Sequence, residues 1–363
     1  MAQQRSTIRD VAHSAGVSPS TVSRVLAGET RHIRAQTRER VQRAAAELDF
    51  HPNVQASALR GGRTYVIALI LSDIANPFWP AFARGVQSVA HHEGYQVVLA
   101  NSDWDRDTEL EYLAMGHRAR FDGIIINPGE VANSDLVVTE IPTVVVGPDI
   151  EFADFDVVAG DTQGGYLDAL RHLADLGHRR VAHIGLLTHG ATAKRRLANF
   201  QHALLEVGLP EQSEFLVAAA YTQDGGRRAM AELLALPNPP TAVLASNDQQ
   251  AIGALAEAQA RGVRVPHDLS IVGFDGIEAT TVTTPPLTTM RVDRQSLGET
   301  AMRFLIERIE GSGPMLYRQR REPCELMVRG TTAPPLAVRP LHEGPRALDK
   351  EVAEAKSEAI ACA

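Results

Sequence analysis

Short apolar runs alternate with amphipathic stretches through most of this chain, and the alternation occurs twice. The first set of runs lies at residues 66–71 (VIALIL), 96–100 (QVVLA), 123–127 (GIIIN) and 143–146 (TVVV); the second lies at 181–186 (VAHIGL), 215–220 (FLVAAA), 241–246 (TAVLAS) and 270–274 (SIVGF). Near-continuous apolar runs of this length are typical of parallel strands buried on both faces. The stretches between them can form crossover helices. The pattern predicts an α/β body of two doubly wound parallel sheets in tandem.

Composition narrows the class of protein. The chain has 363 residues, of which 44% are hydrophobic and 22% charged, as in ordinary globular proteins. Its apolar runs fall well short of the ~20 residues that a membrane span needs. The start MAQQRSTIRD lacks the apolar core of a signal peptide, and Cys324 and Cys362 form no CxxC pair. We therefore expect a cytoplasmic protein with no membrane partner.

The stretch TIRDVAHSAGVSPSTVSRVL, residues 7–26, predicts two short helices joined by a tight turn. Thr7 is a suitable N-cap, Gly16 can end the first helix in the left-handed conformation, and Pro19 can occupy the first position of the second helix. The apolar residues of the second helix share one face, and the opposite face carries hydroxyls and a guanidinium, at Ser20, Thr21, Ser23 and Arg24. A helix-turn-helix presents such a face to the major groove of DNA, although an ordinary helical hairpin fits the pattern equally well.

The charge distribution favours DNA as the partner. Residues 1–63 contain ten Arg and five Asp or Glu, a net charge of +5, whereas the whole chain carries −8, so the remainder carries −13. A basic segment attached to an acidic body is typical of a head that binds a polyanion.

The head continues through TRERVQRAAAELDFHPN to Leu59, six residues after Asn53. In order and spacing, this run resembles the head of LacI/GalR-family transcriptional regulators, and the resemblance extends to about Pro335. It implies an all-α helix-turn-helix domain at 1–50, a hinge helix or linker at 51–63, and a two-lobed periplasmic-binding-protein-like domain for effector binding and dimerisation at 64–332. It also implies that the chain crosses between the lobes near residues 156–162, 274–289 and 320–326. The tail at 333–363 lies outside the resemblance; its first third contains four prolines, and we expect the tail to be disordered or a frayed helix.

The resemblance assigns DNA contacts to the second helix and to the linker. Pro19, Ser20 and Arg24 stand where family members contact bases, and an arginine there can make a bidentate contact with guanine. Thr21 and Ser23 are expected to contact phosphates. Further contacts are expected at Thr7, Asn53, Ala56 and Leu59.

Two of these assignments have plainer alternatives. Leu59 is expected to wedge between base pairs in the minor groove, but it could instead pack against the third helix. Arg24 could contact a phosphate or form a surface ion pair. The sequence also departs from the family pattern, because Arg34 stands where a Ser or Thr usually caps the third helix and Ser57 stands where an Arg usually follows the alanine.

Polar and aromatic residues follow the ends of the predicted strands, where ligands of such sheets bind. The candidates are Asp73, Phe78, Trp79, Asn127, Tyr221 and Asn247, and the resemblance adds Arg196 and its acidic partner Asp275. Such polar groups interleaved with aromatic faces suit a sugar or sugar derivative. A purine or nucleoside stacked on Phe78 and Tyr221 is the alternative. Structural roles are also open: Phe78 or Trp79 in a lobe core, Asn76 in a turn before Pro77, and Asp248 as a helix cap.

Motifs for catalysis are missing from the sequence. It contains no GxSxG, HExxH or P-loop motif, and its 13 histidines are scattered, so we expect no catalytic residues, no metal site and no cofactor. A periplasmic binding protein would need a signal peptide and would lack the basic head, and a sugar-modifying enzyme would need a nucleophile, a metal or an acid–base pair. The sequence favours a repressor that binds a pseudo-palindromic operator as a homodimer, with a tetramer as the alternative, and that a small-molecule effector switches.

Overall fold

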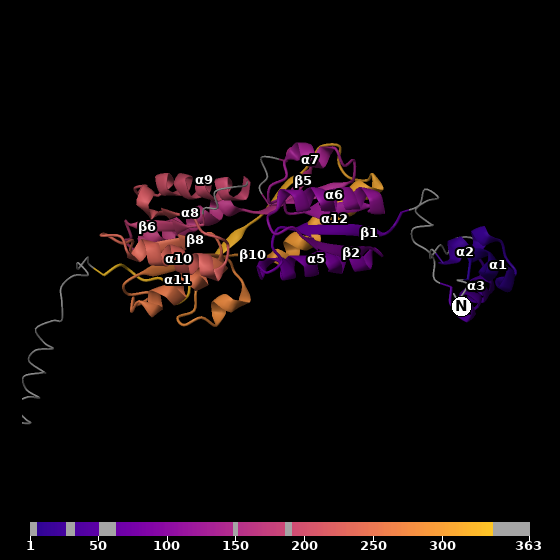
Figure 1. Ribbon diagram of the computed structural model, residues 1–363, viewed down its shortest axis with the longest axis horizontal. Coiled ribbons are helices and arrows are strands. Elements are labelled where there is room, and N and C mark those ends of the chain that lie inside the picture. Colours follow the sequence, from indigo (N-terminus) through magenta and orange to yellow (C-terminus); the bar gives the residue numbers. More distant parts are fainter. Residues whose placement is uncertain (1–5, 27–32, 51–62, 148–151, 186–190, 337–363) are drawn as a thin grey trace, which may run out of the picture.

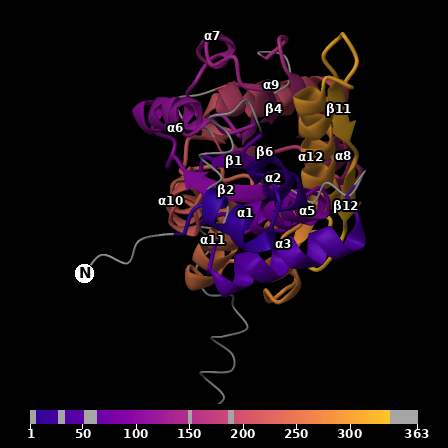
Figure 2. The ribbon, with the colours of Figure 1, turned by 90° about the vertical axis from the view of Figure 1, so that its right-hand side faces the viewer.

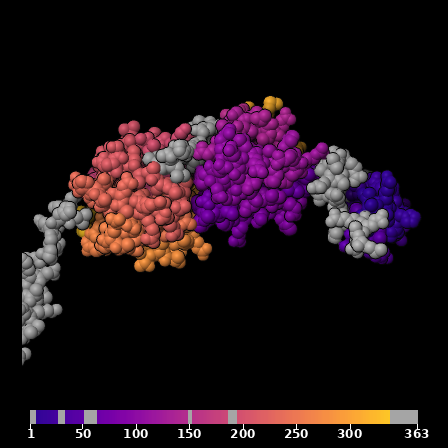
Figure 3. All heavy atoms as spheres, in the orientation of Figure 1, coloured from indigo at the N-terminus to yellow at the C-terminus, as the bar shows by residue number. Residues whose placement is uncertain are grey.

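The computed structural model describes residues 6–26, 33–50, 63–147, 152–185 and 191–336. These residues form a small helical head and two α/β lobes (Figure 1). In the space-filling view the two lobes meet along a seam (Figure 3). None of the helices in the described ranges is both long and apolar enough to cross a membrane.

The head consists of α1 (Ile8–Ala15), α2 (Pro19–Leu26) and α3 (Ala35–Glu47). Thr7 caps α1 through a capping box with Asp10, and Gly16 ends α1 at φ +63°, as the sequence predicts. The N-cap of α3 is Arg34, which makes no side-chain capping bond. One apolar cluster joins the three helices; its buried members are Val11, Ala12, Ala15, Val22, Val25, Val41, Ala44 and Ala45.

The sheet of the first lobe is fully parallel, in the order β11-β5-β4-β3-β1-β2. Its strands are β1 (Val66–Leu71), β2 (Gln96–Asn101), β3 (Gly123–Ile126), β4 (Thr143–Val146), β5 (Asp156–Gly160) and β11 (Gln319–Glu322). Helices α5 (Phe78–His92) and α12 (Arg294–Glu310) cover one face, and α6 (Arg106–Ala119) and α7 (Asn133–Val137) cover the other (Figure 2).

The second lobe repeats this arrangement, with strand order β12-β10-β9-β8-β6-β7. Its strands are β6 (Val181–Ile184), β7 (Leu216–Val217), β8 (Ala242–Ala245), β9 (Ser270–Asp275), β10 (Thr288–Val292) and β12 (Cys324–Met327). Only the β10–β12 pair is antiparallel. Helices α8 (Thr162–Asp175) and α9 (Ala191–Glu206) lie on one face, and α10 (Gln223–Leu234) and α11 (Asp248–Ala260) lie on the other. Short 3₁₀ turns occur at η1 (Ser213–Phe215) and η2 (Glu278–Thr281). The predicted fold class is confirmed.

The chain passes between the lobes at three places, and one of them corrects the prediction. The first passage follows β5 and the third lies at Pro323, between β11 and β12, as expected. The second was expected near residues 274–289, but β9 and β10 both belong to the second sheet, so this passage follows Val292. The run TTMRV was missed as a strand because of its polar residues. Thr289 can be buried there because its hydroxyl donates to Asp248, at 2.5 Å.

Candidate functional site

Helix α2 presents its polar face outward, as the sequence predicts. Pro19, Ser20 and Arg24 are exposed, whereas Val22 and Val25 are buried against the other helices of the head. Thr21 and Ser23 lie at the border and are half-buried. The hydroxyl of Ser18 accepts a hydrogen bond from the backbone N–H of Thr21, at 3.1 Å, which fixes the first turn. The exposed side chains could therefore reach base edges without any rearrangement of the head.

The other predicted DNA contacts lie at Thr7 and in the linker. The Thr7 hydroxyl is engaged with the Asp10 carboxylate at 2.7 Å, and Thr7 is exposed at the start of α1. Asn53, Ala56 and Leu59 lie outside the described residues. Their contacts with DNA stay predictions.

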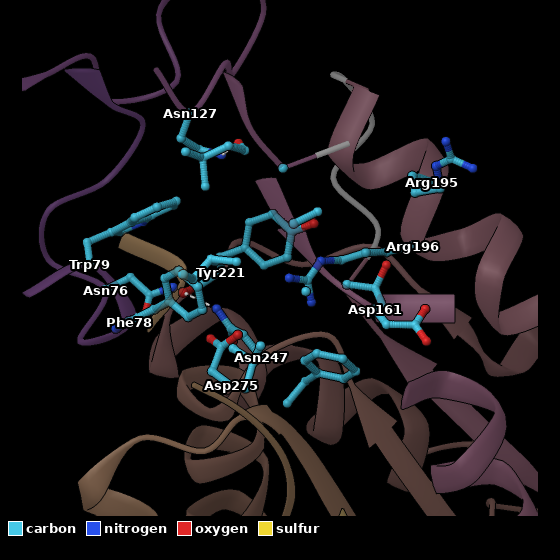
Figure 4. A pocket seen from close by; sticks show the side chains of 18 of the residues that line it. Asn76, Phe78, Trp79, Asn127, Asp161, Arg195, Arg196, Tyr221, Asn247 and Asp275 are labelled. Carbon is cyan, nitrogen blue, oxygen red and sulfur yellow. Dashed lines mark hydrogen bonds between the residues drawn. The ribbon is translucent and has the colours of Figure 1, made fainter. Parts of the chain in front are cut away.

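A cleft open to solvent lies between the lobes, and all eight predicted effector-binding residues line it. Figure 4 labels seven of them. Asp73, Phe78, Trp79 and Asn127 come from the first lobe, and Arg196, Tyr221, Asn247 and Asp275 come from the second. Asp73, Asn127, Tyr221 and Asn247 follow strands β1, β3, β7 and β8, and Asp275 ends β9. Phe78 and Trp79 begin α5, and Arg196 lies in the second turn of α9. The carboxyl ends of parallel strands gather at one edge of each sheet, and the two edges face each other here.

Arg196 lies on α9 and is held from several directions. Its guanidinium carbon lies 5.9 Å from the centre of the Tyr221 ring and 5.4 Å from that of Phe274, and it donates a hydrogen bond to the Ser246 carbonyl. Burial opposes its charge, but Tyr166, Tyr221 and Asp275 raise the pKa of Arg196 above its usual value. Arg196 is therefore a fixed cation in the cleft wall, suited to oxygen pairs on a ligand.

Asp275 ends β9 and is buried, with an unusual backbone φ of +116°. Burial raises the pKa of its carboxyl to about 6, although Arg196, Arg294 and a hydrogen bond from Asn76 act in the opposite direction. Asn76 belongs to the first lobe, and it faces Asp275 of the second lobe across the cleft (Figure 4). The carboxylate is thus poised to exchange a protein partner for a ligand hydroxyl.

The neighbouring Asp248 corrects one structural expectation. Asn247, not Asp248, is the N-cap of α11 and accepts from the backbone N–H of Gln250 at 2.8 Å. Asp248 instead accepts hydrogen bonds from Thr289 and from the backbone N–H of Ile277. Burial and repulsion from Asp275 raise the pKa of Asp248 well above its usual value. Asp248 therefore positions the loop that follows Asp275.

The amide residues of the cleft are largely committed to protein partners. Asn127 accepts from Ser72 at 2.5 Å and donates to the Val146 carbonyl at 2.8 Å. Besides capping α11, Asn247 donates to the Tyr221 carbonyl at 3.1 Å. Each keeps spare acceptor capacity on its side-chain oxygen. Their main effect is to fix the ends of β3 and β8 beside the cleft.

Aromatic rings from both lobes meet in the cleft. Phe78 and Trp79 begin α5, and Trp79 also packs into the core of the first lobe. The ring of Trp104, from the first lobe, lies next to that of Tyr221, from the second. The ring centres are 5.6 Å apart, and the angle between the ring planes is 32°. Burial raises the pKa of Tyr221 to about 12, and its hydroxyl, within the described part of the chain, has no hydrogen-bond partner. A ligand group that bonds this hydroxyl would remove the cost of burying it unpaired.

Several lining residues were not predicted from the sequence. These are Trp104, Asp161, Thr162, Gln163, Arg195, Asn199 and Arg321. Asp161 and Thr162 directly follow β5 and obey the strand-end rule, but residues 156–160 had not been identified as a strand. Trp104 lies in the loop after β2 at φ +61°, and no local signal indicates that this loop reaches the second lobe. Across the described ranges, no three His, Cys, Asp or Glu side chains gather in a way that could hold a metal ion.

Known proteins share both parts of this architecture. Residues 7–53 match the family described as bacterial regulatory proteins, lacI family, and residues 170–332 match the periplasmic binding protein-like domain. The chain is 35% identical over 340 residues to the HTH-type transcriptional regulator DegA of Bacillus subtilis (strain 168), covering 91% of this chain and 99% of DegA. It is 32% identical over 311 residues to the HTH-type transcriptional repressor PurR of Aliivibrio salmonicida (strain LFI1238), covering 84% of this chain and 92% of PurR.

Solved structures show the same likeness over both lobes and the head. The lac repressor dimer bound to operator and the anti-inducer ONPF is 28% identical, with a TM-score of 0.80, covering 91% of this chain and 100% of that one. The transcriptional regulator CelR–cellobiose complex is 29% identical, with a TM-score of 0.68, covering 90% of this chain and 100% of that one. This chain therefore belongs to the LacI family, and it is a DNA-binding transcriptional regulator with a helix-turn-helix head and a periplasmic-binding-protein-like body.

Proposed function

We propose that this regulator is a repressor whose affinity for operator DNA is set by a sugar or sugar derivative in the inter-lobe cleft. The observation that carries the proposal is the two-sided lining of the cleft. Arg196, Tyr221 and Asp275 of the second lobe face Asn76 and Phe78 of the first. A ligand that touches both sides binds one arrangement of the lobes better than others, and so shifts the population between them.

The chemistry of the lining favours a polyhydroxylated ligand. The Arg196 guanidinium and the Asp275 carboxylate offer a donor and an acceptor for neighbouring hydroxyls, and the Tyr221 hydroxyl is available for a third bond. The rings of Phe78 and Trp79 can cover the C–H face of a sugar. A cellobiose complex is known for the related CelR.

A purine is the second candidate. Phe78 and Tyr221 both line the cleft and offer ring faces from opposite lobes, between which a flat heterocycle could stack. The ligand test below decides between the two classes.

The test is a DNA-binding titration on a duplex that the protein itself selects from a random pool. Cellobiose, D-ribose, hypoxanthine and guanosine are added separately. We expect at least one sugar to change the DNA affinity about 10-fold or more, equivalent to about 1.4 kcal/mol of coupling. A response to purines alone would establish the second candidate, and no response to any probe would contradict the proposed effector classes.

Two cleft variants and one control assign the response to the site. Arg196→Ala and Asp275→Ala should abolish it while leaving DNA binding without ligand measurable. Lys194→Ala is the control, because Lys194 is an exposed cation on the same helix that does not line the cleft. If Arg196→Ala and Asp275→Ala responded as fully as Lys194→Ala, the effector would bind elsewhere.

We also propose that the protein binds its operator as a homodimer, with base contacts from Pro19, Ser20 and Arg24 and phosphate contacts from Thr21 and Ser23. Two copies related by a twofold axis require a near-palindromic site. The duplexes selected from the random pool should therefore contain two inverted half-sites. Light scattering of the complex distinguishes the dimer from a tetramer, and a single unrepeated half-site bound by one chain would contradict the proposal.

A further inference from the structure

The first described residues after the head are anchored to the first lobe at two separate places. The backbone N–H groups of Thr64 and Tyr65 each donate to the Asp122 carboxylate at 2.8 Å. The side chain of Arg63 instead reaches the end of α12. It donates to the Ile309 carbonyl at 3.2 Å and lies 3.5 Å from the Glu310 carboxylate.

The end of α12 is a suitable partner for an arginine. The last carbonyls of a helix have no partners within the helix, and the helix dipole places partial negative charge there. The C-cap of α12 is Gly311, which adopts the left-handed conformation at φ +69°. The side chains of Arg63 and Glu310 are 38% and 49% exposed, so this contact contributes little to the stability of the fold.

The other end of α12 lies at the cleft. Arg294 donates to the Gly276 carbonyl of the second lobe at 3.2 Å, directly after Asp275, and Leu297 lines the cleft. From Arg294 to Glu310 the helix rises about 24 Å, at 1.5 Å per residue. One helix therefore contacts the second lobe at its first residue and holds Arg63 at its last turn.

Helix α12 also packs closely against α5. A Cβ added at Gly298 of α12 would lie 2.1 Å from the Phe82 carbonyl oxygen, and one added at Gly85 of α5 would lie 2.1 Å from the Gln295 carbonyl oxygen. The two backbones touch at this crossing, and Phe78 at the start of α5 lines the cleft. A change in the arrangement of the lobes thus acts on a stiff helix pair rather than on loose side chains.

We propose that Arg63 is a positioning residue for ligand control: it ties the chain leaving the head to the end of α12, so that the state of the cleft reaches the head through this helix. The inference rests on the proposed function in one respect, that the arrangement of the lobes alters DNA binding. It assigns a role to a residue that does not line the cleft.

The decisive experiment needs no ligand. Asn76→Ala removes a first-lobe side chain that faces Asp275 across the cleft, and so perturbs the contact between the lobes. DNA affinity is measured for the wild type, Asn76→Ala, Arg63→Ala and the double variant, on the duplex selected by the wild type. We expect Asn76→Ala to change the affinity at least fivefold, and less than twofold in the Arg63→Ala background.

Additivity would overturn the inference. Substitutions this far apart normally act independently, so an equal effect of Asn76→Ala in both backgrounds means that Arg63 transmits nothing. No effect of Asn76→Ala in the wild type means that the cleft does not reach the head by this route, and it overturns the inference as well.

Three controls separate positioning from charge and stability. Arg63→Lys keeps a cation and a donor and should restore most of the coupling. Arg84→Ala removes an exposed cation from α5 and should leave the coupling unchanged. All variants should melt within error of the wild type; a coupling lost equally in Arg84→Ala would mean that only net charge matters and would contradict the role of Arg63.

A ligand arm keeps this inference distinct from the proposed function. If cellobiose, D-ribose or hypoxanthine alters DNA binding of the wild type, Arg63→Ala should bind that probe with unchanged affinity in the absence of DNA. The effect of the probe on DNA affinity should be lost. If no probe binds, the proposed effector classes fail, while the ligand-free cycle still decides the role of Arg63.

Discussion

At the residue scale, Asp275 has several features that lower the stability of the folded protein. It is buried, adopts a φ of +116° and lies beside a second buried acid, Asp248. Each of these features costs free energy, and such strain concentrates at functional sites. Under the proposed function, this cost is offset because a carboxylate between Arg196 and Asn76 accepts a ligand hydroxyl.

Asp275→Asn should stabilise the ligand-free protein in a pH-dependent way. The pKa of Asp275 is about 6 in the folded protein, above the model-compound value of 3.8, so the folded state binds more protons between these values. Wild-type stability should therefore fall as the pH rises from about 4 to 6. The variant lacks this loss and should gain roughly 1–3 kcal/mol at pH 7.5, with less gain at pH 5. Denaturant unfolding at both pH values checks this; a gain equal at both would contradict it.

Arg24→Ala should reduce sequence discrimination more than overall DNA binding. The side chain is exposed on the outer face of α2, where a bidentate contact with guanine is worth about 1–3 kcal/mol of discrimination. Affinities for the selected duplex and a scrambled one give the measurement. Arg40→Ala, which removes another exposed cation of the head, is the control. Equal weakening on both duplexes by Arg24→Ala would reduce Arg24 to a phosphate contact.

At the element scale, one buried carboxylate joins three elements of the first lobe. Asp156 of β5 is fully buried and accepts from Arg308 of α12 at 2.7 and 2.8 Å. It also accepts from the side chain of Arg318, just before β11, at 2.8 Å. Although burial acts in the opposite direction, these bonds lower the pKa of Asp156 to about 2. The contact fixes the position of α12 against the sheet.

Asp156→Asn should therefore destabilise the protein by about 3–5 kcal/mol at neutral pH, because it leaves two arginines without their buried partner. The pKa of Asp156 is depressed, so its contribution is complete above about pH 4 and is lost as the pH falls towards 2. The difference between variant and wild type should shrink over that range. Asp168→Asn, in an exposed pair with Arg171, is the control and should change stability by less than about 1 kcal/mol.

The crossing of α5 and α12 should not tolerate a methyl group. Gly298→Ala places a Cβ against a backbone oxygen that cannot move aside, and it should cost roughly 1–3 kcal/mol or more. Gly116→Ala is the matched control inside α6, where the nearest atom lies 3.5 Å away. That change should be neutral or stabilising by up to about 1 kcal/mol, since glycine weakens helices. Thermal unfolding of both variants decides between these expectations.

At the scale of the whole molecule, the head and the lobes have separate cores. The apolar cluster of the head contains only residues of the head, and each lobe has its own clusters on the two faces of its sheet. The lobes share one strand order and are joined by three passages of the chain. Separate cores with few connections favour rigid-body movement of the lobes around the cleft.

A chain that begins at Arg63 should therefore fold and keep its ligand site. We expect it to unfold cooperatively, to bind the same effector as the full chain with similar affinity, and to lose DNA binding. Circular dichroism melts and calorimetric titration with the effector check this against the full chain. Failure of the shortened chain to fold would mean that the head stabilises the body through contacts beyond those described.

The strands that are continuous apolar runs and the caps Thr7 and Gly16 were predictable because each depends on neighbours in the chain. The strand-end rule placed Asp73, Asn127 and Tyr221 at one cleft for the same reason. Strand β10 was missed because its buried threonines need partners on distant elements, such as Asp248 for Thr289. A local sequence pattern does not show which distant residues will be the partners.

By itself, the sequence determined the helices of the head, the eight apolar strands and many of the polar groups that follow them, since these depend on propensity, periodicity and capping over a few residues. Only the tertiary structure decided what faces what. It brought Trp104 onto Tyr221 and Asn76 onto Asp275, and it placed the two ends of α12 against Gly276 and Arg63. The physical reason is that such contacts depend on how the two lobes pack, and the packed surfaces are assembled from segments that are separate in the chain.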